Sequence, residues 1–143
     1  MQADQTTTAV LSPQEALIYA MVTAAAADRT ISDVELSRMH SMVRELPAFR
    51  SLDDAWFSRE AQECGKILRR PEGVGAVVRL LAQALSRELR ETAYALAAEV
   101  TASDLTIKDD ERDFLALLRE GLQLDELVCA ALQRAAQARH KSV

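Results

Sequence analysis

The amino-acid sequence predicts an all-α protein, a compact bundle of about seven helices. Alanine and leucine dominate its 143 residues, aromatic residues make up only 4%, and there are four glycines and three prolines. This composition is rich in helix formers and poor in strand formers. Apolar residues recur at helical spacing, and no segment alternates apolar and polar residues over the length of a strand. A chain of this length is typical of one domain, which we place at residues 12–143.

Capping residues mark the starts of the expected helices. After a flexible leader over residues 1–11, Ser12–Glu15 form a capping box with Pro13 at the first helical position. Ser32–Glu35 form a second capping box, and Asp53 or Asp54 begins a third helix. Pro71 is expected to open the fourth. The expected helices cover residues 12–27, 32–46, 53–68, 71–85, 87–101, 109–120 and 125–138.

Hydrophobic stripes indicate which helix faces turn inward. The expected inward residues of the second, sixth and seventh helices are Leu36, Met39, Val43 and Leu46; Phe114, Leu115, Leu117 and Leu118; and Leu127, Val128, Ala131 and Leu132. Trp56 and Phe57 are expected in the core, and His40 on the surface. The two cysteines, Cys64 and Cys129, belong to no CxxC pattern, which favours two buried thiols over a disulfide or a metal site.

Charge and motif content exclude several classes of function. The net charge is −5 and the pI about 5.1, which argues against a general binder of nucleic acid or anionic membranes. No signal peptide and no apolar run of roughly 18 residues is present, so a cytoplasmic location without membrane insertion is expected. The only histidines, His40 and His140, match no zinc-protease or di-iron pattern, and no glycine-rich phosphate loop occurs. A non-enzymatic role is expected, without a cofactor.

The most informative feature is an internal repeat at an offset of 76 residues. Residues 26–35 and 102–111 both read A-x-D-x-T-I-x-D-x-E, agreeing at six of ten positions. In each copy an alanine-rich helix precedes the motif and an amphipathic helix follows it. The pattern predicts a duplicated helix pair with pseudo-twofold character.

This arrangement resembles the TerB-like family of tellurite-resistance proteins. The resemblance covers roughly residues 13–135 and includes the fragment Tyr94–Glu99 that leads into the second copy. It implies a helical bundle, a link to tellurite and stress resistance, an acidic functional surface and no established catalysis. It also implies a protein partner, in the setting of membrane-associated resistance machinery. The family's glycine after each motif aspartate is Arg29 and Leu105 here, so the turn geometry is expected to differ.

Two interpretations of the repeated acidic residues stay open. Ser32 with Glu35 explains the first copy as helix capping, and Asp28 can accept local amides in a turn. Alternatively, four carboxylates converge on one divalent cation if the two hairpins pack together. The candidate metal ligands are Asp28, Glu35, Asp104 and Glu111. An EF-hand is excluded, because alanine and valine occupy its earlier ligand positions.

Overall fold

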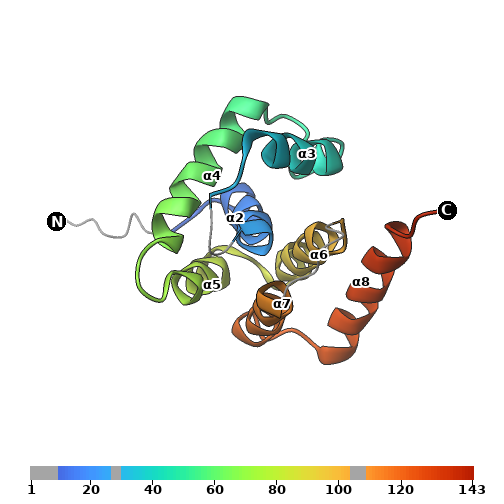
Figure 1. Cartoon of the computed structure of the whole chain (residues 1–143). Helices are drawn as coiled ribbons and strands as arrows, with labels where there is room; N and C mark the ends of the chain where they lie inside the picture. The colour runs from blue at the N-terminus through green and yellow to red at the C-terminus, as the bar shows by residue number, and fades with distance from the viewer. Residues whose placement is uncertain (1–9, 27–29, 104–108) are drawn as a thin grey trace.

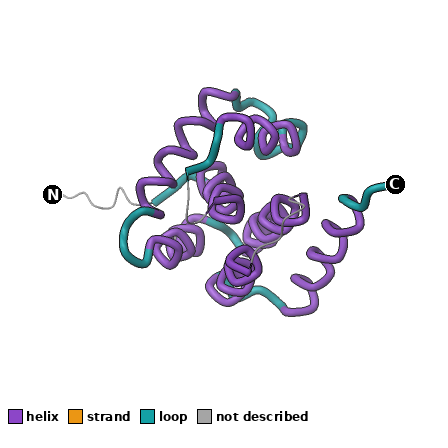
Figure 2. Tube along the Cα trace, viewed as in Figure 1, coloured by secondary structure: helices purple, strands orange, loops and turns teal. Residues whose placement is uncertain are grey.

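The computed structural model describes residues 10–26, 30–103 and 109–143, with side chains from residue 113 onward in the last range. Within these ranges the chain forms helices and no strand, as the sequence predicts (Figures 1 and 2). The helices are α2 (Pro13–Ala26), α3 (Asp33–Val43), α4 (Asp54–Leu68), α5 (Gly73–Ala84), α6 (Arg87–Ser103), α7 (Asp109–Gly121) and α8 (Glu126–Arg139). None of the helices so described is long and apolar enough to cross a membrane.

Helix α2 lies at the centre of the bundle. Every residue from Ala16 to Ala24 is buried, so the helix is enclosed on all sides rather than amphipathic. It packs against α4, α5, α6 and α7, and most closely against α6 (Figure 1). The many alanines of α2 and α6 permit this close approach, and the resulting core positions the surrounding helices.

Helix α8 packs mainly against α6 and otherwise lies at the edge of the molecule (Figure 1). Its last turn is held by Glu99 of α6, whose carboxylate forms an ion pair with Arg139 and lies 2.7 Å from Nε2 of His140. Burial raises the pKa of Glu99, but the hydrogen bonds from Arg139 and His140 outweigh it and hold the pKa below its ordinary value.

The inward face predicted for α8 is wrong for Leu127 and Ala131, whereas Leu132 packs partly buried against the core as predicted and Val128 is half-buried. Leu127 is 79% exposed and Ala131 is exposed, whereas Cys129 and Ala136 are buried. Because α8 meets essentially one neighbour, a narrow stripe is enough to bury, and the stripe through Cys129 is the one that faces α6. Leu117 of α7 is likewise 48% exposed, while its neighbours Phe114, Leu115 and Leu118 are buried.

Helix α3 ends earlier than predicted. Its last helical residue is Val43, and residues 44–51 form turns, with the N–H of Leu46 donating to the carbonyl of Val43 at 2.9 Å. Leu46 therefore leaves the buried stripe and is 39% exposed. Phe49 takes its place in the core as a fully buried ring.

Helix α5 begins at Gly73, two residues later than the predicted start at Pro71. The preceding residue, Glu72, has φ 57°, a left-handed conformation that turns the chain sharply out of α4. A Cβ at Gly73 would lie 2.4 Å from the carbonyl oxygen of Ile67 and 2.7 Å from Cα of Leu68. Only glycine allows the two helices to meet this closely.

The cysteine prediction is confirmed: Cys64 and Cys129 are both free and buried. Burial raises the pKa of the Cys64 thiol to about 12, and the hydrogen bond between Thr23 and Cys64 offsets only part of that rise. The thiol is therefore protonated and unreactive at neutral pH. Of the predicted leader over residues 1–11, residues 1–9 lie outside the described part of the chain.

Candidate functional site

A surface groove with a volume of about 600 Å³ lies between α2, α3 and α4. We refer to it as the α4 groove. Its apolar lining comes from Val22, Ala26, Ile31, Leu36, Ala61, Gly65 and Leu68, and its polar lining from Thr30, Asp33, Ser58, Gln62, Lys66 and Arg69. Its volume falls in the range of sites that accept ligands or anchoring side chains.

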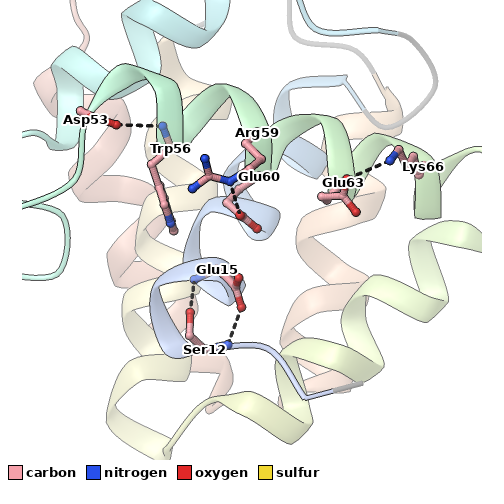
Figure 3. Close-up of polar contacts among 8 residues, drawn as sticks. All are labelled: Ser12, Glu15, Asp53, Trp56, Arg59, Glu60, Glu63 and Lys66. Carbon is pink, nitrogen blue, oxygen red and sulfur yellow. Dashed lines mark hydrogen bonds and ion pairs between the residues drawn. The ribbon is translucent and has the colours of Figure 1, made fainter. Parts of the chain in front are cut away.

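One face of α4 forms the long wall of this groove. The residues involved follow at intervals of three or four, from Ser58 through Ala61, Gln62 and Gly65 to Arg69. Asp53 starts the helix by accepting a hydrogen bond from the N–H of Trp56 at 2.9 Å (Figure 3). The adjoining face of α4 carries Phe57 and Cys64 into the core. The groove is thus the half-exposed border of an amphipathic helix.

The start of α3 forms the facing wall, and the capping box predicted there is present. The N–H of Glu35 donates to Oγ of Ser32 at 3.1 Å, and the N–H of Ser32 donates to Oε1 of Glu35 at 3.1 Å. Ile31 and Leu36, the positions of a hydrophobic staple around this cap, both line the groove. The first copy of the repeated motif therefore leads directly into the groove.

An aromatic cluster holds α3 and α4 together at the end away from Asp33. His40 of α3 pairs through Nδ1 with the Asp54 carboxylate, and its ring stacks on Phe57 with centroids 4.2 Å apart. Phe49 lies 5.4 Å from Phe57, centroid to centroid. His40 is only 6% exposed, so its predicted surface position is wrong. Of the predicted core pair, Phe57 is fully buried and Trp56 partly so, which confirms that they pack inward.

The rim of the groove carries two cations and one carboxylate. Lys66 pairs with Glu63, Nζ to Oε2, at 2.9 Å (Figure 3). Asp33 is the first residue of α3, where the helix dipole favours an anion. Arg69, at the end of α4, forms no ion pair with any carboxylate in the described part of the chain. Its guanidinium lies over Gly65, 3.5 Å from where a Cβ would be.

A second group of titratable side chains lies between α2 and α4. The carboxyl of Glu60 is directed toward that of Glu15 (Figure 3) and lies 3.6 Å from Nε of Arg59. Burial, and next the neighbouring charge of Glu15, raise the pKa of Glu60 above its usual range. Glu15 itself caps α2, because its Oε1 accepts from the N–H of Ser12 at 2.8 Å. These two carboxyls are part of the packing between helices rather than a ligand set.

The four predicted metal ligands are described only in part. Asp28 and Asp104 lie outside the described residues, as does the side chain of Glu111. Glu35 belongs to the capping box of α3. Among the described residues, no group of three or more histidine, cysteine, aspartate or glutamate side chains is placed to hold a metal ion.

Sequence reasoning missed most of the groove residues. Ser58, Gln62 and Arg69 belong to no recognisable motif, and their common face appears only once the bounds of α4 are known. The available signal was their spacing of three or four residues along a helix.

Comparison of the chain with family models, with curated proteins and with solved structures finds no match.

Proposed function

We propose that this protein is a non-enzymatic helical binding module that engages a protein partner through the α4 groove. The observation that supports it best is the groove itself, which has an apolar floor, hydrogen-bonding side chains and a cation, Arg69, that pairs with no carboxylate in the described part of the chain. Protein-binding surfaces combine an apolar centre with a polar rim in this way. The groove's walls are well-capped helices, so the site is largely formed before anything binds.

The described titratable groups support binding rather than catalysis. Burial raises the pKa of Cys64, so its thiol is protonated at neutral pH and is not in the thiolate form that attacks a substrate. The imidazole of His40 in α3 is paired with the Asp54 carboxylate and stacked on Phe57. The groove is lined by no histidine and no cysteine, so the residue types that most often transfer protons or attack carbonyls are not at this site.

We further propose that the chain is a duplicated unit, as in the TerB-like family that its sequence resembles. Shifting α2 by 76 residues places it within α6, and the same shift places α3 within α7. Helix α4 packs on α2, and α8 packs on α6. The α4 groove then belongs to the first unit, and the partner would be a component of a tellurite- or stress-resistance system.

The test is capture of partners by the wild-type protein and by a variant with the groove filled. Gln62→Trp places a large ring at an exposed lining position of α4, so the core is not disturbed. Gln137→Trp makes the same change at an exposed position of α8 and is the matched control. A protein that binds the wild type and the control, but not Gln62→Trp, supports the proposal. Its affinity is then measured by calorimetry with purified components.

Equal binding by all three proteins would rule out the α4 groove as the contact surface. Circular dichroism should show the same helix content for both variants, because neither glutamine is buried. Loss of binding by the Gln137→Trp control would direct attention to α8 instead.

A further inference from the structure

The α4 groove is elongated along one helix. Its lining residues on α4 extend from Ser58 to Arg69, and at 1.5 Å rise per residue this wall is about 16 Å long. That length corresponds to roughly three turns of an α-helix. An elongated straight wall favours an elongated occupant over a compact small molecule.

The volume limits how much of the occupant enters. A helix of about 10 Å diameter and 16 Å length fills roughly 1,250 Å³, whereas the groove holds about 600 Å³. Only one edge of such a helix can therefore be received. The floor formed by Val22, Leu36, Ala61 and Leu68 is apolar, so that edge must be apolar as well.

The charges on the rim indicate what flanks this edge. The chain carries a net charge of −5, yet Lys66 and Arg69 place two cations at one end of the groove. Lys66 is already paired with Glu63, while no carboxylate in the described part of the chain pairs with Arg69. A guanidinium binds a carboxylate through two parallel hydrogen bonds, which makes Arg69 the natural partner of an aspartate or glutamate.

We propose that the α4 groove receives an amphipathic helix of the partner protein, with its apolar edge on the floor and an acidic side chain paired with Arg69. This inference rests on the proposed function and adds the secondary structure and the charge of the bound segment. The acidic residue lies at the end of the bound helix that is next to the C-terminus of α4.

The test uses a display library of helical peptides of about 14 residues, roughly four turns. Each peptide has a fixed apolar stripe, and the flanking positions are randomised. The library is selected separately on the wild-type protein, on Arg69→Glu and on Arg70→Glu. Arg70 is the matched control, because it is the next residue, is also exposed and does not line the groove.

Selection on the wild type and on Arg70→Glu should enrich aspartate and glutamate at one flank. Selection on Arg69→Glu should enrich lysine and arginine at the same flank. A selected acidic peptide should lose about tenfold or more in affinity for Arg69→Glu, the equivalent of a charged hydrogen bond, and keep its affinity for Arg70→Glu. Arg69→Lys should lose less, because it keeps the charge without the bidentate geometry.

Three outcomes would overturn the inference. The selection on the wild type could yield no helical peptide, the selected peptides could still bind Gln62→Trp, or they could carry no acidic residue at the flank. If a natural partner nevertheless loses binding to Gln62→Trp and keeps binding to Arg69→Glu, the proposed function stands and only the charge assignment fails. Circular dichroism on each variant confirms that the fold is retained.

Discussion

Two glycines, Gly65 and Gly73, should respond to alanine substitution in opposite directions. Gly65 lies within α4 on the groove wall, and a Cβ there would meet only Nη1 of Arg69, at 3.5 Å. This is ordinary van der Waals contact with the end of a flexible side chain. Gly73 begins α5, and a Cβ there would lie 2.4 Å from the carbonyl oxygen of Ile67.

The size of each effect follows from these contacts. Gly65→Ala should stabilise the fold by about 0.5–1 kcal/mol, because alanine is the better helix former and nothing must move. Gly73→Ala forces the end of α4 and the start of α5 apart by about 1 Å, since the obstructing atoms are backbone. Overpacking of this kind costs about 1–3 kcal/mol. The two variants should therefore differ by about 1.5–4 kcal/mol.

Urea unfolding followed by circular dichroism measures both free energies of unfolding, provided that the slope with denaturant is unchanged. Gly65→Ala should also narrow the groove by one methyl group. The affinity for a partner should therefore fall while the fold becomes more stable. If Gly73→Ala were as stable as Gly65→Ala, the close meeting of α4 and α5 would be wrong.

Three further variants test other parts of the fold. Glu60→Gln should be more stable than the wild type at pH 7 and equally stable below about pH 4.5. Burial and the charge of Glu15 raise the pKa of Glu60 in the folded protein, so the wild type loses stability as the pH rises through that raised pKa. Glu99→Gln should be less stable at pH 7, and the difference should vanish as the pH falls through the lowered pKa of Glu99, where its pair with Arg139 is lost. Unfolding curves collected across pH check both signs. Leu127→Lys should change the free energy of unfolding by no more than about 0.5 kcal/mol, since that side chain is 79% exposed.

Helix positions were predictable because the capping signals are local. Ser12 and Ser32 each begin a capping box, and Asp53 and Asp125 each cap a helix through their side chains. A cap depends on three or four consecutive residues, so the sequence contains all the necessary information. These four helices begin where the sequence places them or one residue from it.

Features that depend on more than one helix were not predictable. His40 has a polar sequence neighbourhood, yet it is buried because Asp54 and Phe57 approach it from another helix. The stripe of Leu127 looks as apolar as that of Cys129, and only the position of α6 decides between them. The α4 groove was not predictable for the same reason, because its lining residues come from three helices.

The left-handed residue Glu72 and the close approach at Gly73 show where local rules fail. The sequence indicates a proline-started helix at Pro71, but the tight connection from α4 displaces the start to Gly73. Gly73 allows α4 and α5 to meet this closely, just beyond the groove wall that ends at Arg69.

Site-specific photo-crosslinking in cells of the protein's own host tests most directly whether the α4 groove contacts a partner. A photo-reactive amino acid replaces Gln62 on the groove wall in one sample and Gln137 on α8 in another, both exposed positions. We predict a covalent adduct with one defined protein from position 62, at a helical segment with an acidic residue, and none of that adduct from position 137. Adducts of equal yield from both positions, or none from position 62 while the partner still binds, would contradict the assignment of the groove.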